Sequence, residues 1–467
     1  MARKRSDRPN VVLFFTDQQR WDTTGVGGCP LDLTPNYDRM ATEGMHLSNM
    51  MTCQPVCGPA RSCLQTGMYA SNTGVYTNRQ MPMNPELKTL GSYFKEGGYT
   101  TGYIGKWHLA ENEIPGPVKP ELRAGYDYWL ASNILEFTSN AYDTEMYDGD
   151  GKPVKLPGYR VDACTDAAIR YIDEHQDEPF FLTISYIEPH HQNHTDDYPA
   201  PDGYAEKYQA RWTPPDLTAL GGSSQQHLAG YYGMIKRLDE ALGRLRDSIK
   251  SLGLEEDTVI LYTADHGNHF KTRNGEYKRS CHDASIHIPG AITGPGFNGG
   301  GRIKSLTSLI DVPPTLLDAA AIPVPAVMQG RSMKPLARGP VADWPAESFT
   351  QISEAEVGRC IRTVRWKYSV QAEQADMLPN HQGATRYTEA FLYDLQADPY
   401  ELKNLVGRTH LRDVADSLQK RLLARMAEVG EDLPEIVPAK PTPAGQGTSN
   451  QAAADTLGED WLSPHRP

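Results

Sequence analysis

The chain has 467 residues, of which 39% are hydrophobic, and it carries a formal net charge of -13. This length is enough for one large α/β domain with a smaller partner. Because an acidic surface repels phosphate backbones and anionic membranes, we expect no nucleic-acid partner and no membrane association.

The first segment, MARKRSDRPNVVLFFTDQQ, has a basic start and an apolar run that extends only from Val11 to Phe15. A run of this length is too short for the core of a signal peptide or for a membrane span. We therefore expect a cytoplasmic protein. A periplasmic or secreted location would apply if a leader had been removed from the sequence.

Short apolar runs that end in polar residues predict buried strands along the first two thirds of the chain. These runs are Val11 to Phe15, Thr100 to Ile104, Phe180 to Tyr186 and Thr258 to Tyr262. Helix-compatible stretches between them are Leu87 to Glu96, Val161 to Glu174 and Leu228 to Leu252. This alternation predicts an α/β fold with a mainly parallel sheet and helices on both faces. Ligands bind at the C-terminal ends of such strands, so the polar clusters TDQQ, GKWH, EPHH and TADHG predict one common site.

A Pro- and Ala-rich stretch from Pro335 to Glu347 predicts a linker. Beyond it, Cys360 to Val370 and Ala390 to Leu395 predict strands of a smaller antiparallel sheet, and Leu411 to Val429 predicts a helix. We therefore divide the chain into a catalytic domain over residues 1–345 and an α+β subdomain over residues 346–436. Residues 437–467 form a low-complexity tail.

The seven cysteines are irregularly spaced and include no CxxC pair, which argues against a disulfide framework and a zinc ribbon. Three of them lie in CQPVCGPARSCLQTG, residues 53–67. The part that starts at Cys57 resembles the signature C-x-P-[SA]-R-x-x-x-x-T-G of the type I sulfatases. In that family a formylglycine-generating enzyme oxidises the cysteine to formylglycine. The resemblance assigns this role to Cys57 and leaves Cys53 and Cys63 as buried thiols.

Further motifs extend the resemblance from Pro9 to Leu405. They are Asp17-Gln18, Gly105-Lys106-Trp107-His108, Pro189-His190, Asp265-His266-Gly267, the spacing of Lys278 and Pro289, and the segment Leu392 to Leu405. The resemblance implies an alkaline phosphatase-like fold and the hydrolysis of sulfate esters.

The resemblance also implies one divalent cation, generally calcium, which prefers oxygen ligands. By similarity its ligands are Asp17, Gln18, Asp265, His266 and the formylglycine made from Cys57. The hydrate of the aldehyde supplies two hydroxyls: one attacks sulfur, and the other lets the sulfated hydrate collapse and release sulfate.

Family members surround the aldehyde with groups that orient and deprotonate its hydrate, hold the sulfate oxygens and protonate the leaving oxygen. By similarity these groups are, in that order, Arg61 and His108, then Lys106, Lys278 and Asn78, and finally His190.

The sequence departs from the commonest family pattern at several positions. Gln18 replaces a second aspartate and His266 replaces asparagine, while His282-Asp283 and His287 replace residues that contact the leaving group in relatives. The rival function is a phosphonate monoester or phosphodiester hydrolase, which uses the same DQ and DH pairs. Those relatives have tyrosine and threonine where this chain has Lys106 and His108, and this difference favours sulfate esters. A catalytically inactive binding protein would show decay of the catalytic positions, and we find none.

The loops over residues 131–151 and 188–204 are rich in Tyr, Asn, Asp and His, which suits hydrogen bonding and stacking against a sugar. We therefore expect a saccharide O-sulfate as substrate, with His287 near the leaving group. Arg359 and Arg362 would read a second anionic group. The sequence leaves open the sugar, the hydroxyl that carries the sulfate and the oligomeric state.

Overall fold

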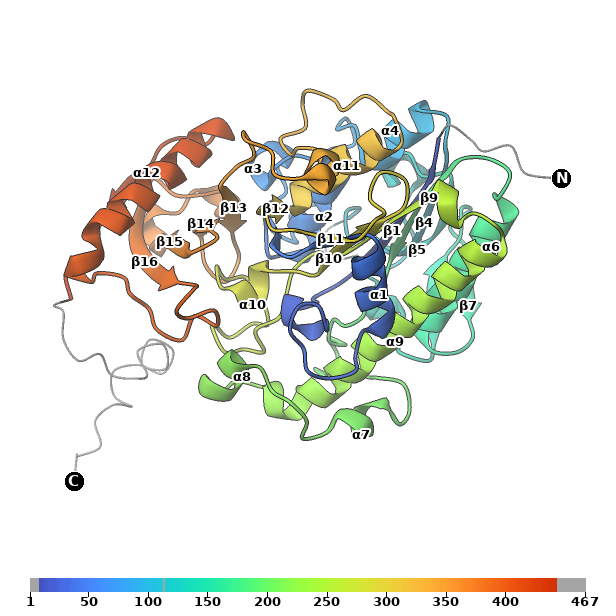
Figure 1. The fold of residues 1–467 in the computed structure, drawn as a ribbon, viewed down its shortest axis with the longest axis horizontal. Helices are drawn as coiled ribbons and strands as arrows, with labels where there is room; N and C mark the ends of the chain where they lie inside the picture. Colours follow the sequence, from blue (N-terminus) through green and yellow to red (C-terminus); the bar gives the residue numbers. More distant parts are fainter. Residues whose placement is uncertain (1–7, 112–113, 443–467) are drawn as a thin grey trace.

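The larger part of the computed structural model, which describes residues 8–111 and 114–442, is built around a ten-stranded sheet (Figure 1). In spatial order the strands are β11 (Gly301–Ile303), β2 (Met45–Leu47), β10 (Gly290–Thr293), β9 (Thr258–Ala264), β1 (Asn10–Thr16), β8 (Phe180–Ser185), β4 (Thr100–Lys106), β5 (Tyr128–Ser132), β6 (Thr144–Tyr147) and β7 (Pro153–Leu156). The five central strands, from β9 to β5, run parallel to their neighbours, whereas β10, β6 and β7 pair antiparallel. The predicted mainly parallel sheet is therefore confirmed.

Strand β1 is buried on both faces because successive side chains of a strand point to opposite sides. Val11, Leu13 and Phe15 pack into one hydrophobic cluster, and Val12 and Phe14 pack into another. The first cluster contains α2 (Cys57–Thr66), α4 (Leu90–Glu96) and α11 (Val312–Ala319), and the second contains α1 (Pro35–Glu43), α6 (Arg160–Glu174) and α9 (Ser224–Ser251). Helices thus cover both faces of the sheet.

The four predicted strands correspond to β1, β4, β8 and β9, and the three predicted helices correspond to α4, α6 and α9. The outer strands β11, β2, β10, β6 and β7 have only three or four residues, so the hydrophobic pattern did not indicate them. The other short elements are β3 (Met50–Met51), β12 (Thr307–Ser308), α3 (Ala70–Thr73), α5 (Leu135–Thr138), α7 (Tyr204–Tyr208), α8 (Pro215–Ala219) and α10 (Asp283–Ile286).

A second, five-stranded sheet lies at one end of the molecule beside helix α12 (Arg412–Glu428) (Figure 1). Its strands are β13 (Glu347–Ile352), β14 (Gly358–Thr363), β15 (Trp366–Gln371), β16 (Arg386–Asp394) and β17 (Glu435–Val437). Strands β13 to β16 pair antiparallel, and the stretch from Cys360 to Val370 contains parts of two strands joined by a turn. Residues 443–467 of the predicted tail lie outside the described residues.

The two sheets share one hydrophobic cluster, in which Phe349 and Ile361 of the small sheet join residues of β1 and α2. All seven cysteines are buried and none forms a disulfide, as the irregular spacing predicts. Within the described ranges, no helix combines the length and the apolar character that crossing a membrane requires.

Candidate active site

The polar clusters that follow β1, β4, β8 and β9 meet at one edge of the sheet because β9, β1, β8 and β4 are consecutive neighbours. The carboxyl ends of parallel strands lie at the same edge. Asp17 and Asp265 follow β1 and β9, Lys106 ends β4, and His190 follows β8. The sequence prediction of one common site is therefore reproduced in the arrangement of the strands.

Helix α2 carries Cys57 into this site at its first position. Pro59 is tolerated in the first turn because the N–H that it lacks has no helical partner there. The N–H of Gly58 donates to Asn78 Oδ1 at 2.9 Å, which satisfies another unpaired donor of the helix start. The N-terminus of a helix favours negative charge, so Cys57 stands where an anionic group is stabilised.

Four buried side chains, one of which is Cys57, converge in a way that suits a metal ion. Asp17, Cys57, Asp265 and His266 each offer one ligand atom, and these atoms lie within 4.8 Å of one another. His266 Nε2 is 3.7 Å from Asp17 Oδ1, 3.6 Å from Asp265 Oδ1 and 3.2 Å from Cys57 Sγ. The Oδ1 atoms of Asp17 and Asp265 therefore both face His266 Nε2.

The hydrogen bonds around this cluster leave the ligand atoms in the state that a cation requires. His266 Nδ1 donates to the carbonyl oxygen of Gly267 at 3.0 Å, so Nε2 is the ring nitrogen that is turned towards the carboxylates. Arg61 binds the outer oxygens instead, at 2.9 Å from Asp17 Oδ2 and 3.2 Å from Asp265 Oδ2. Two buried carboxylates and one imidazole nitrogen around one space fit a divalent cation.

Gln18 lies beside the cluster but points its side chain to other partners. Its Nε2 donates to Tyr198 Oη at 3.1 Å, and its Oε1 accepts from Lys278 Nζ at 3.4 Å. Its backbone N–H donates to Asp265 Oδ1 at 3.0 Å. Gln18 therefore orients Asp265 and connects the carboxylates to Lys278.

The cationic groups form a layer around residue 57. Lys106 is fully buried, and its Nζ is 2.8 Å from Asp17 Oδ2 and 2.9 Å from Glu136 Oε1. Lys278 Nζ is 2.9 Å from Cys57 Sγ and 3.1 Å from His190 Nε2. His190 Nδ1 lies 2.6 Å from the carbonyl oxygen of His191 and must donate to it, so Nε2 is the acceptor that faces Lys278.

These cations change the acidity of the thiol. Burial raises the pKa of Cys57, but Lys106, Lys278 and His266 lower it more, and the net pKa is well below the usual range of a thiol. The pKa of Lys106 is raised, because the attraction of Asp17, Cys57 and Glu136 exceeds the cost of burial. The site therefore stabilises negative charge at residue 57, which is the charge that a nucleophile or a sulfate group brings.

Two residues of the site have a left-handed backbone, which side chains other than glycine seldom adopt. These are Gln18, with φ 66°, and His108, with φ 61°. Nearby, Gly105 has φ 107°, and a Cβ there would lie 2.0 Å from the carbonyl oxygen of Ser185. Only glycine fits this position of the GKWH segment, and such strain concentrates at functional sites.

A cavity of about 400 Å³ opens over Cys57. Asn78, His108, His190 and Lys278 line it together with Cys57, as the sequence predicted for one site. The two polar loops over residues 131–151 and 188–204 both contribute to the lining. Besides His190, their lining residues are Ile134, Glu136, Phe137, His191 and Asn193. Arg61 and Lys106 are not among the lining residues and lie in the layer beneath.

The structure does not bring His287, Arg359 or Arg362 to this cavity. The ring of His287 stacks on Trp21 with centroids 4.6 Å apart. Arg359 forms a buried ion pair with Glu431 at 2.7 Å, and Arg362 forms one with Asp283 at 3.0 Å. The two arginines are already paired with carboxylates, and the ring of His287 is stacked on Trp21. We therefore do not retain the three predicted substrate contacts.

Glu136 is a residue of the site that the sequence reasoning missed. It lies in α5, a helix of four residues with no recognised motif. Its Oε1 pairs with Lys106, whereas its buried Oε2 has no hydrogen-bond partner among the described residues. Burial raises the pKa of Glu136, but Lys106, His190 and His108 lower it more, so the carboxylate form is favoured.

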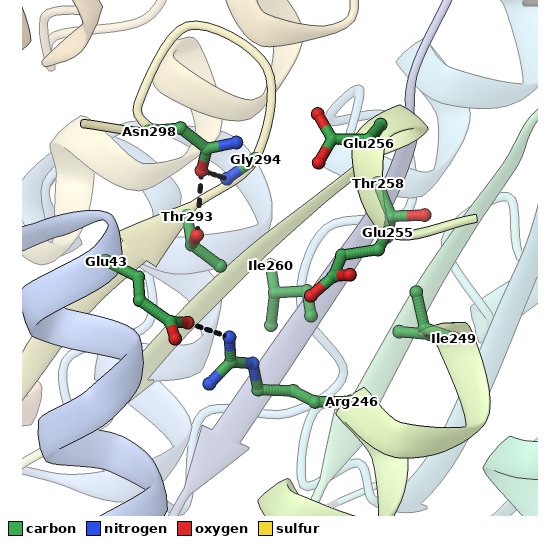
Figure 2. A pocket seen from close by; sticks show the side chains of 10 residues that line it. All are labelled: Glu43, Arg246, Ile249, Glu255, Glu256, Thr258, Ile260, Thr293, Gly294 and Asn298. Carbon is green, nitrogen blue, oxygen red and sulfur yellow. Dashed lines mark hydrogen bonds and ion pairs between the residues drawn. The ribbon is translucent and has the colours of Figure 1, made fainter. Parts of the chain in front are cut away.

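Another cavity, of about 190 Å³, lies at the opposite end of strand β9 (Figure 2). Arg246 forms an ion pair there with Glu43, and Asn298 Oδ1 accepts hydrogen bonds from Thr293 and Gly294. None of the residues that the sequence analysis proposed for the site lines this cavity. Its polar groups bind mainly to one another, so we place the active site at the Cys57 end of the sheet.

The mainly parallel sheet, the smaller antiparallel sheet and the cluster of candidate metal ligands at the C-terminal strand ends are those of an alkaline phosphatase-like fold. Comparison with protein families then assigns the chain more closely. The Sulfatase family model matches residues 9–322, and the model for the C-terminal part of N-sulphoglucosamine sulphohydrolase matches residues 275–428. The chain therefore belongs to the sulfatase family, and it is a sulfuric ester hydrolase.

Individual relatives agree with this assignment. The chain is 29% identical to the ulvan-active sulfatase of Formosa agariphila over 91% of this chain and 82% of that protein. The crystal structure of the yidJ protein of Bacteroides fragilis superposes with a TM-score of 0.82 at 23% identity, covering 93% of this chain and 98% of that one. A protein solved with its substrate D-glucosamine-2-N,6-O-disulfate superposes with a TM-score of 0.74 at 23% identity, covering 91% and 98%. The last two comparisons, at 23% identity, show that this chain shares its fold with those two proteins.

Proposed function

We propose that this sulfatase hydrolyses O-sulfate esters of saccharides, and that its nucleophile is a formylglycine made from Cys57. The observation that carries the proposal is the position of Cys57 at the base of a polar cavity. Lys278 Nζ lies 2.9 Å from its sulfur, and His108 and His190 line the same cavity. A sulfate ester is an anion that repels nucleophiles, so its hydrolysis requires this concentration of positive charge.

The metal site fits the same reaction. Asp17, Asp265 and His266 would hold a divalent cation, which we propose to be calcium, together with residue 57 and with Gln18 beside them. A bound cation of this kind lowers the pKa of a coordinated hydroxyl and neutralises charge on the sulfate. Arg61 keeps the two carboxylates in place by binding their outer oxygens.

The protein side chains divide the remaining tasks. Lys278 and Asn78 would bind sulfate oxygens at the cavity, while Lys106 adds positive charge from below. His108, which lines the cavity, would accept the proton of the attacking hydroxyl. His190, which lines the cavity with its Nε2 3.1 Å from Lys278 Nζ, would protonate the leaving oxygen.

The lining of the cavity supports a saccharide as the group that carries the sulfate. The side chain of Phe137 is 53% exposed at the cavity wall and offers an aromatic surface for a sugar ring. Asn193 and the unpartnered Oε2 of Glu136 offer hydrogen bonds for hydroxyl groups. The names of the relatives agree, since one is an ulvan-active sulfatase and another was solved with a glucosamine disulfate.

The test is turnover of a panel of sulfated monosaccharides, with an aryl sulfate and a phenyl phosphonate ester as comparisons. The enzyme should be produced together with a formylglycine-generating enzyme, and mass spectrometry of the Cys57 peptide should verify the conversion. We expect the highest kcat/KM for one of the sulfated sugars. If the phosphonate ester is cleaved fastest, the rival hydrolase activity replaces this proposal. If the aryl sulfate is cleaved faster than every sulfated sugar, the enzyme is a sulfatase but its substrate is not a saccharide.

A further inference from the structure

A second cavity, of about 640 Å³, adjoins the one over Cys57. The two cavities share three lining residues, which are Asn78, Glu276 and Arg279. The second cavity is lined by residues from four separate chain segments, 77–80, 276–279, 354–355 and 380–381. A ligand whose sulfate sits at Cys57 therefore has a continuous space into which it can extend.

Asn78 connects the two cavities directly. Its side-chain oxygen accepts from the Gly58 N–H beside Cys57, at 2.9 Å. Its backbone N–H donates to Glu354 Oε1 at 2.6 Å, on the side of the second cavity. The wall between the reacting position and the second cavity is thus held by one residue that is bonded in both directions.

The charges in the second cavity are balanced. Arg279 forms ion pairs with Glu276, at 2.8 Å, and with Glu354. Arg79 adds a second positive charge to the lining, so two arginines face two glutamates. Asn380 and His381 add polar groups to the lining, and the side chain of Gln80 donates to the backbone oxygen of Asn380. This balance suits the hydroxyl groups of an uncharged sugar better than it suits a second anion.

The backbone of the second cavity is strained. Arg279, Glu354, Asn380 and His381 all line it, and their φ angles are 70°, 72°, 57° and 58°. Left-handed backbone at residues other than glycine persists where the surrounding structure enforces it, and such residues cluster at ligand sites. Four such residues in one cavity wall indicate a surface that is shaped for a ligand.

We propose that the second cavity is a subsite for the next sugar of an oligosaccharide, recognised through its hydroxyl groups. The inference rests on the proposed function, because it needs a saccharide sulfate at Cys57. It predicts that the natural substrate has at least two sugar residues and that the second need not be charged.

The experiment compares a sulfated monosaccharide with a disaccharide that carries the same sulfated sugar joined to an uncharged one. For the fully converted enzyme we expect kcat/KM to be about tenfold higher for the disaccharide, which corresponds to roughly 1.4 kcal/mol of binding free energy. Ala355→Trp fills the second cavity, where Ala355 is an exposed lining residue, and should bring the ratio of the two kcat/KM values close to one. Ala424→Trp, at an exposed position of α12, is the matched control and should preserve the ratio.

Arg79→Ala is a second variant, which removes a polar lining residue without adding bulk and should lower the ratio less than Ala355→Trp does. A wild-type ratio near one, or a ratio that neither lining variant changes, would overturn the subsite. If the enzyme turns over an aryl sulfate but neither sugar, the proposed saccharide function fails, and the subsite fails with it. These results differ, so the two failures can be told apart.

Discussion

The ten-stranded and the five-stranded sheet of this molecule both carry buried charged side chains, but in different arrangements. At the edge of the large sheet, Asp17, Asp265 and His266 turn their ligand atoms towards one space in front of Cys57. In the small sheet, Arg359 pairs with Glu431, and Arg362 pairs with Asp283. The first arrangement leaves ligand atoms directed at a common centre, whereas in the second each arginine is paired with a carboxylate from a neighbouring element. Convergence of buried groups on a cavity, rather than their charge, therefore marks the active site.

Replacing the proposed nucleophile should have the largest effect on activity. Cys57→Ala removes the precursor of the aldehyde, and we expect kcat to fall by at least about 10⁴-fold. Turnover of the best sulfated sugar measures the loss. Cys53→Ala is the control, because Cys53 is buried in the hydrophobic cluster and does not line the Cys57 cavity. An equal loss in both variants would mean that the thiols act through packing.

Removing a proposed metal ligand should have the next largest effect. His266→Ala deletes the nitrogen that faces both carboxylates, and we expect kcat/KM to fall by about 10²- to 10³-fold, equivalent to about 3–4 kcal/mol. The bound metal, measured by elemental analysis, should fall in parallel. Treating the wild-type enzyme with a chelator should reproduce the loss, and added calcium should restore the activity. Full activity in a metal-free preparation would contradict this assignment.

Glu136→Gln should have a smaller effect, since it keeps the shape of the residue that binds Lys106 but removes its charge. We expect kcat/KM to fall by about tenfold, or roughly 1.4 kcal/mol. The pKa of Glu136 is lowered in the folded protein, so its ionised form adds stability above the ordinary pKa of a glutamate. That contribution disappears as the pH falls through the folded pKa. Thermal unfolding curves of the variant should therefore depend less on acidic pH than those of the wild type.

The smallest effect on activity is expected for Arg359→Ala, in the small sheet. The variant leaves Glu431 without its main cation, and we expect the free energy of unfolding to fall by about 3–5 kcal/mol. The kcat/KM of the folded protein should stay at the wild-type value. Arg365→Ala, which breaks an exposed pair with Asp394, should destabilise much less. A raised KM in Arg359→Ala with unchanged stability would return Arg359 to the substrate site.

Much of the centre of the fold could be predicted from the sequence because the strands that carry the site are continuous apolar runs. Strands β1, β4, β8 and β9 are buried on both faces, and the polar residues after them reach one edge. The positions of Asp17, Cys57 and Asp265 follow from motifs that stand at these strand ends or at the start of α2.

The roles of other charged residues could not be predicted, because they depend on pairings between residues far apart in the sequence, which no local pattern reveals. Glu136 sits in a short helix, and only the fold places it against Lys106. Arg359 resembles a substrate contact until Glu431, which follows α12, is found beside it. In both cases the function of a charged side chain is decided by its neighbour in space.

The central claim is that sulfate ester hydrolysis by this enzyme requires the aldehyde at residue 57. The most direct test is to prepare the enzyme with different extents of Cys57 conversion, measured by mass spectrometry, and to determine the turnover of a sulfated sugar for each preparation. The account predicts that specific activity rises in proportion to the converted fraction and extrapolates to zero for unconverted cysteine. An activity that is independent of the converted fraction would contradict it.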